Sequence, residues 1–283
     1  SMPWVIRTPI TQRPLDNIIN PVKEMTMIEK NSAVLLMILA SLSGCAKDYG
    51  LAPPVDSEKI TVTVKVPKDL RARTMQVMYR SSVCTFTDHS ASGVAYQRDG
   101  YHRIDMQPVR QGHSDHYDAR LSVDGGGTCQ WRLSNVTFGV VYEDPSMFGK
   151  GVTYGAGGGI VVVFDENNSP RGGVGIKASG DLSIKKDYYP WVDEEFLGHY
   201  EKTINLVGEV ETYLGYQALQ ARKVYFEPVL HSDFVLYSAG PKKKKKGNYT
   251  RFVFPDGSVV ADGRPDSKFL RLQAIRKAAE AKP

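Results

Sequence analysis

Hydrophobic and polar residues alternate along several short segments of the chain, and this alternation predicts β-strands. In residues 60–66 (ITVTVKV) the isoleucine and valines fall on one face of an extended chain, and the threonines and lysine fall on the other. Further predicted strands are residues 75–83, 101–109, 117–123, 129–142, 160–164, 182–184, 202–207, 223–230, 234–238, 249–254 and 258–261. Turn residues separate these segments. The pattern predicts a mainly β protein.

Glycine-rich and proline-containing turns indicate how some strands connect. The turn Asp124-Gly125-Gly126-Gly127 predicts a hairpin between residues 117–123 and 129–142, because glycine adopts positive φ without steric cost. Residues 255–257 (Pro-Asp-Gly) predict a second hairpin. Residues 160–164 (IVVVF) are apolar throughout, which is typical of a buried central strand.

The chain ends in a predicted helix. Asp266 is the expected N-cap, and Phe269, Leu272 and Ile275 follow at helical spacing. With 41% hydrophobic and 24% charged residues, the chain has the composition of a globular protein. We therefore expect two β-sandwich-like blocks, residues 58–145 and residues 146–283, with a short C-terminal helix in the second.

Residues 33–42 (AVLLMILASL) form an apolar run with lysines upstream. As a helix of about 1.5 Å per residue, this run would cover only half of a hydrocarbon layer of about 30 Å. A signal-peptide core fits its length and its flanking residues better than a membrane-spanning helix, and a buried core helix is the alternative.

The end of this run, Leu42-Ser43-Gly44-Cys45, matches the lipobox of bacterial lipoprotein precursors, in which the cysteine thiol accepts the lipid. The match implies that Cys45 is the lipid attachment site and that residues 1–44 are a signal peptide with an over-long N-terminal extension. Met25 or Met27 is a more usual start. Residues 45–57 then form a lipidated tether. Ala46 follows the cysteine in place of Asp, and resemblance to enterobacterial lipoprotein sorting then implies the periplasmic face of the outer membrane.

Two cysteines remain, Cys84 and Cys129, and in an exported chain they are expected to form a disulfide. Such a bond would connect the second predicted strand of the first block to its last. Two buried free thiols are the alternative. A zinc site has less support, because the sequence has no Cys-x-x-Cys and His89 adds only one further ligand near Cys84.

Catalytic motifs are not found, and we expect neither an enzyme nor a cofactor. The sequence has no Gly-x-Ser-x-Gly, HExxH, Walker or EF-hand pattern, and residues 173–178 fit a dinucleotide fingerprint only superficially. His113, Asp115, His116 and Asp118 are the best metal candidates. A polar loop between strands explains the same cluster.

The formal charge of +5 is concentrated in five consecutive lysines, residues 242–246. The rest of the chain is nearly balanced, so a nucleic-acid partner is not expected. The lysine run is typical of a solvated loop. Contact with anionic lipid head groups or with an acidic protein patch is the alternative.

Residues 187–196 combine aromatic and acidic side chains around a proline, a composition found in protein-binding hot spots. A buried corner of the core is the alternative interpretation. The predicted partner-binding residues are Tyr188, Tyr189, Trp191, Asp193, Glu194 and Glu195.

Together with the lipobox and the paired cysteines, residues 77–81 (VMYRS), 131–140 (WRLSNVTFGV) and 185–191 (KKDYYPW) resemble enterobacterial immunity lipoproteins encoded beside type VI secretion phospholipase effectors. The resemblance implies a periplasmic protein that binds and neutralises a cognate phospholipase effector, anchored to the membrane by its lipid. A structural or assembly lipoprotein of an envelope machine is the alternative function.

Overall fold

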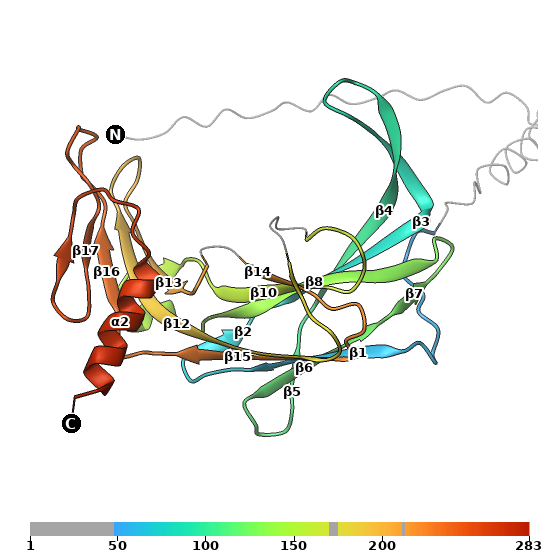
Figure 1. The fold of residues 1–283 in the computed structure, drawn as a ribbon, viewed down its shortest axis with the longest axis horizontal. Coiled ribbons are helices and arrows are strands. Elements are labelled where there is room, and N and C mark those ends of the chain that lie inside the picture. The colour runs from blue at the N-terminus through green and yellow to red at the C-terminus, as the bar shows by residue number, and fades with distance from the viewer. Residues whose placement is uncertain (1–47, 170–174, 211–212, 283) are drawn as a thin grey trace, which may run out of the picture. The chain divides into compact units, whose positions relative to one another are not determined.

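The computed structural model describes residues 48–169, 175–210 and 213–282. Within them, Tyr49–Pro283 forms one compact unit of two β-sheets and a C-terminal helix (Figure 1). The predicted fold class, mainly β with a short C-terminal helix, is confirmed. The predicted signal peptide and Cys45 lie outside the described residues.

The first sheet has ten strands in the order β18-β17-β16-β12-β15-β1-β6-β5, with β13 beside β12 and β9 beside β13. Their bounds are β1 Lys59–Lys65, β5 Val109–Arg110, β6 His116–Ser122, β9 Thr153–Tyr154, β12 Leu182–Glu195, β13 Glu201–Val207, β15 Lys223–Leu230, β16 Leu236–Ala239, β17 Arg251–Val253 and β18 Val259–Val260.

The second sheet has eight strands in the order β11-β14-β10-β8-β3-β4, with β2 and β7 also paired to β8. Their bounds are β2 Leu70–Ala72, β3 Met75–His89, β4 Ala95–Met106, β7 Asp124–Gly126, β8 Trp131–Tyr142, β10 Gly158–Val163, β11 Ile176–Lys177 and β14 Leu214–Gln217. A short 3-10 helix, η1 Pro145–Phe148, follows β8, and the helix α2 spans Lys268–Glu280.

The main core lies between the two sheets. Ile60, Val62 and Val64 alternate with half-exposed residues along β1, as their spacing predicts, and each is at most 2% exposed. From the facing sheets, the rings of Phe138 and Phe226 meet edge to face with centroids 5.9 Å apart. Both predicted blocks supply strands to both sheets, since β1 pairs with β15 and β8 pairs with β10. Residues on either side of 145 therefore share one core.

Strand β12 connects this core to a second one beneath the helix. Along one edge β12 pairs first with β15, as far as Tyr188, and then with β16, from Trp191 onward. Pro190 lies between these two pairings, where the absent N–H breaks no ladder hydrogen bond on that edge. Successive side chains of a strand point to opposite faces. Tyr188 accordingly packs in the main core and Tyr189 in the second core, with Phe269 and Leu272 of α2.

Two local predictions are wrong. The strands β6 and β8 do not form a hairpin, because β6 pairs with β1 and β5 while β8 belongs to the other sheet. The glycine turn instead carries the chain from one sheet to the other, and its residues form β7 beside β8. The N-cap of α2 is Ser267, whose hydroxyl accepts the N–H of Leu270 at 3.3 Å, and not Asp266.

Other local predictions are confirmed. Strand β10 lies between β14 and β8 and is almost entirely buried, as expected of a central strand. Strands β17 and β18 pair antiparallel across the predicted turn, in which Gly257 has φ of 84°.

Candidate functional site

The predicted disulfide is present and joins Cys84 of β3 to Cys129, which lies just before β8. The two Cα atoms are 5.3 Å apart and the residues are separated by 45 positions in sequence. Cys129 is fully buried. The bond therefore fixes the middle of the long strand β3 to the edge of the main core.

Of the six predicted partner-binding residues, the two tyrosines are buried and the other four are partly or fully exposed. Tyr189 is completely buried and Tyr188 is 6% exposed, so the core-corner interpretation fits both rings. The Tyr189 hydroxyl donates to Oε1 of Gln273 at 2.5 Å and accepts Nε of Arg276 at 2.8 Å. These contacts hold α2 against the sheet, and the burial of Tyr189 excludes its direct contact with a partner.

The other four predicted residues are partly or fully exposed, and three of them already have partners within the chain. Trp191 donates its indole N–H to the Ser238 hydroxyl at 2.7 Å, and that hydroxyl donates to Asp193. Glu194 accepts the hydroxyl of Tyr200 at 3.0 Å. Glu195 is exposed, and partial burial together with the charges of Asp193 and Glu201 raises its pKa.

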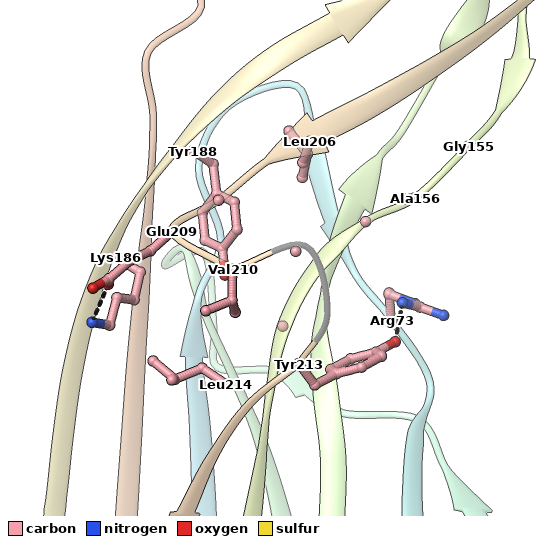
Figure 2. Close-up of a pocket in the computed structure, with 14 residues that line it drawn as sticks. Arg73, Gly155, Ala156, Lys186, Tyr188, Leu206, Glu209, Val210, Tyr213 and Leu214 are labelled. Atoms are coloured by element: carbon pink, nitrogen blue, oxygen red, sulfur yellow. Dashed lines mark hydrogen bonds and ion pairs between the residues drawn. The ribbon is translucent and has the colours of Figure 1, made fainter. Parts of the chain in front are cut away.

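Tyr188 and the glycine segment before β10 line a pocket of about 270 Å³ (Figure 2). A side chain at Gly158 would place its Cβ 2.4 Å from the Tyr188 ring, so glycine is required for the ring to lie there. Arg73 donates to the Tyr213 hydroxyl at 2.6 Å on one side of the pocket, and Lys186 donates to Glu209 at 2.7 Å on the other.

Two ionisable groups of this pocket, Lys186 and Tyr188, have raised pKa values. Burial lowers the pKa of Lys186, but the hydrogen bond to Glu209 and the electrostatic interactions with Tyr216 and Glu209 together outweigh burial, so the pKa is raised overall. Burial raises the pKa of the Tyr188 hydroxyl. Lys186 therefore stays protonated and Tyr188 stays neutral. A second hollow of about 510 Å³ shares Ala156, Leu206 and residues 208–210 with this pocket and reaches Trp191 and Phe269.

The predicted metal candidates lie in a turn and at the start of a strand. His113 and Asp115 belong to the turn between β5 and β6, and His116 begins β6, where Nε2 lies 3.5 Å from the Tyr225 hydroxyl. In the part of the chain that the structure describes, no group of three or more His, Cys, Asp or Glu side chains is arranged to hold a metal ion.

A projecting hairpin is the most distinctive surface feature. Strand β8 pairs with β3 only as far as Arg80, and beyond it β3 pairs with β4 alone among the described residues. Residues 81–99, here called the arm, therefore form a two-stranded ribbon that extends beyond the body of the unit (Figure 1). No described strand pairs with the outer edges of the arm, and free backbone N–H and C=O groups along such edges are suited to pairing with another chain.

The root of the arm is fixed by several interactions besides the disulfide. The Ser81 hydroxyl donates to the carbonyl of Cys129 at 2.5 Å and accepts the N–H of Cys84 at 2.9 Å. The pairing of β3 with β4 shifts register between Ser81 and Phe86. Gly100 lies opposite, and a Cβ there would fall 1.9 Å from the carbonyl oxygen of Cys84. The arm therefore leaves the sheet at a defined position.

The two faces of the arm differ in chemistry. Phe86 is paired with Arg98 and Asp88 with Tyr96, so these four side chains share one face, here called the aromatic face. The Phe86 ring also contacts the ring of Tyr101 edge to face, with centroids 5.7 Å apart. Asp88 and Arg98 form an ion pair at 2.8 Å, and this contact lowers the pKa of Asp88.

The aromatic face is open to solvent: Tyr96 is 44% exposed, and Tyr101, which contacts Phe86 from just beyond the arm, is 62% exposed. The opposite face carries Thr85, Thr87 and Gln97, whose side chains hydrogen-bond to one another. Sequence reasoning missed the arm, because residues 84–97 lack an alternation of apolar and polar residues. The exposed tyrosines and Arg98 are the residue types that recur in protein-binding hot spots.

No known protein family, curated protein or solved structure matches the chain. None of the helices that the structure describes is both long and apolar enough to span a membrane.

Proposed function

We propose that this protein is an envelope lipoprotein, anchored through Cys45 at the periplasmic face of the outer membrane. In this proposal it neutralises a type VI secreted phospholipase by binding it. The arm is the binding element, and its aromatic face contacts the toxin.

The observation that carries the proposal is the open aromatic face of the arm. A two-stranded hairpin with neither face buried is marginally stable in water and contributes little to the stability of the fold. Free strand edges also favour pairing with another chain, which leads to aggregation when that pairing is not specific. In this protein the ribbon is fixed at its root by the Cys84–Cys129 bond. A projecting element held in one position loses little conformational entropy when it binds, which favours affinity.

The disulfide also supports the proposed location. Disulfides persist in oxidising compartments such as the periplasm and are rare in the cytosol. An exported chain tethered to a membrane would meet a phospholipase where that enzyme attacks its substrate. Inhibition requires a rigid complementary surface and no reacting group in the inhibitor.

The proposal expects a gene for a phospholipase beside the gene for this chain, and the test uses the product of that neighbouring gene. Purified Tyr49–Pro283 is titrated with that phospholipase by calorimetry, and phospholipid hydrolysis is measured in parallel. We expect a stoichiometric complex and loss of hydrolysis. A neighbouring gene that encodes no phospholipase, or hydrolysis that continues at saturating concentrations of the protein, would contradict the proposal.

A further inference from the structure

Two loops lie together near β16 and β17. Residues 196–200 connect β12 to β13, and residues 240–250 connect β16 to β17. Gly240 donates its N–H to the carbonyl of Glu194 at 2.7 Å, and the Lys242 ammonium lies 5.2 Å from the centroid of the Phe196 ring. The two loops therefore form one continuous surface, here called the basic patch.

The basic patch carries a concentrated positive charge. All five lysines of residues 242–246 are exposed, and none forms an ion pair with another described residue. Two acidic residues end β12 beside these loops: Glu194 accepts the Tyr200 hydroxyl and lies 4.0 Å from Lys202, and the Glu195 carboxylate lies beside Gly240. The lysine charges are thus free to attract an anionic surface.

Apolar and aromatic side chains lie beside the lysines. Leu197 is 43% exposed and Tyr200 is 60% exposed. Tyr200 also contacts the Phe196 ring, with centroids 5.3 Å apart. Lysines next to exposed tyrosine and leucine are a composition found where proteins meet the interface of a bilayer.

We propose that the basic patch binds the anionic phospholipid surface of the membrane. The lysines pair with phosphate groups, and Leu197 and Tyr200 enter the interfacial layer. This role is separate from toxin neutralisation and does not depend on it. An acidic protein would also satisfy the charges, and the vesicle experiment below distinguishes it from a lipid surface.

The position of the patch fits a second attachment point. The first residues of the compact unit lie beside β7, where Ala52 donates to the carbonyl of Gly125 at 2.9 Å. Strands β7 and β17 are at opposite ends of the unit (Figure 1). The second attachment depends on the lipid anchor proposed above: a chain lipidated at Cys45 would be tethered at the β7 end and would present the patch to the same membrane at high local concentration, so a weak contact suffices.

The experiment uses the Tyr49–Pro283 unit, which contains both hydrophobic cores and no lipid. Its sedimentation with phosphatidylglycerol vesicles and with phosphatidylcholine vesicles is measured at low and high salt. We expect binding to phosphatidylglycerol only, and weaker binding at high salt because salt screens the charges. Changing all five lysines of residues 242–246 to glutamine should weaken binding by at least about tenfold.

A matched variant changes five exposed lysines elsewhere to glutamine, with the same loss of net charge: Lys68, Lys150, Lys177, Lys223 and Lys282. This control should retain most of the binding, whereas Leu197→Ser with Tyr200→Ser should weaken it. Equal loss in the scattered variant, equal binding to both lipids, or capture of an acidic protein without any binding to vesicles would overturn the proposal.

Discussion

Cys84 is bonded to Cys129, and this bond ties the root of the arm to a buried residue just before β8. The bond encloses 45 positions of sequence, so it restricts the unfolded chain strongly. The stability of the body and the position of the arm thus depend on the same pair of residues.

Removal of this bond should destabilise the protein. We expect Cys84→Ser with Cys129→Ser to lower the free energy of unfolding by about 2–4 kcal/mol, measured by urea denaturation. A reducing agent should produce a similar loss in the wild-type protein and no further loss in the double variant. Unchanged stability of the double variant would show that the fold does not depend on the bond.

Gly158 should not tolerate a side chain. A Cβ there would lie 2.4 Å from the Tyr188 ring, which is itself packed against Phe226. Because the ring cannot move freely, we expect Gly158→Ala to lower the free energy of unfolding by about 1–3 kcal/mol. Gly158→Ala should lower the free energy of unfolding less when Tyr188 is replaced by leucine. A double-mutant cycle of Gly158→Ala and Tyr188→Leu measures this interaction energy.

Gly215→Ala is the control for this substitution, because the nearest atom would be 3.7 Å from its Cβ. Its effect on stability should be small. Equal losses at Gly158 and Gly215 would contradict the steric explanation.

Acid should weaken the attachment of α2. Burial would raise the pKa of Asp187, but hydrogen bonds from His231 at 2.7 Å and Gln273 at 3.0 Å, with the charge of Arg276, lower it overall. A carboxyl group whose pKa is lower in the folded state contributes stability above its unfolded pKa of about 3.9. That contribution is lost as the pH falls through the folded pKa.

We therefore expect the free energy of unfolding to fall as the pH drops below about 5, and the fall to be shallower in Asp187→Asn. The variant should also be less stable than wild type at neutral pH, by about 1–2 kcal/mol. Asp56→Asn, an exposed residue outside this network, is the control. If Asp187→Asn leaves the acid slope unchanged, Asp187 is not the group responsible.

The sequence predicts the strands that bury one face. In β1, Ile60 and Val62 alternate with polar residues, because one side of the strand faces the core and the other faces solvent. The arm could not be predicted in this way. Thr87 and Tyr96 lie on opposite faces of a ribbon that buries neither, so no alternation marks the strands.

The candidate site was only partly predictable, because a sequence pattern does not show which faces of a strand are covered. Tyr188 and Tyr189 are adjacent in sequence, and burial of both requires a separate layer on each side of β12. The aromatic and acidic composition of residues 187–196 alone resembles that of a surface hot spot. The pairing of Cys84 with Cys129 was predictable because two cysteines remain once Cys45 is assigned, as an expectation, to lipid attachment.

The most direct test of the proposed function is the affinity of arm variants for the neighbouring phospholipase, measured by calorimetry with its inhibition measured in parallel. Tyr96→Ala with Tyr101→Ala removes the exposed tyrosine ring of the aromatic face and the exposed ring that contacts Phe86 at the root of the arm, and should weaken binding by about 2 kcal/mol or more. Thr87→Ala with Gln97→Ala alters the opposite face of the same ribbon and should leave affinity within about threefold of wild type. Wild-type affinity in the tyrosine variant, with its fold intact by circular dichroism, would contradict the assignment of the arm as the toxin-binding element.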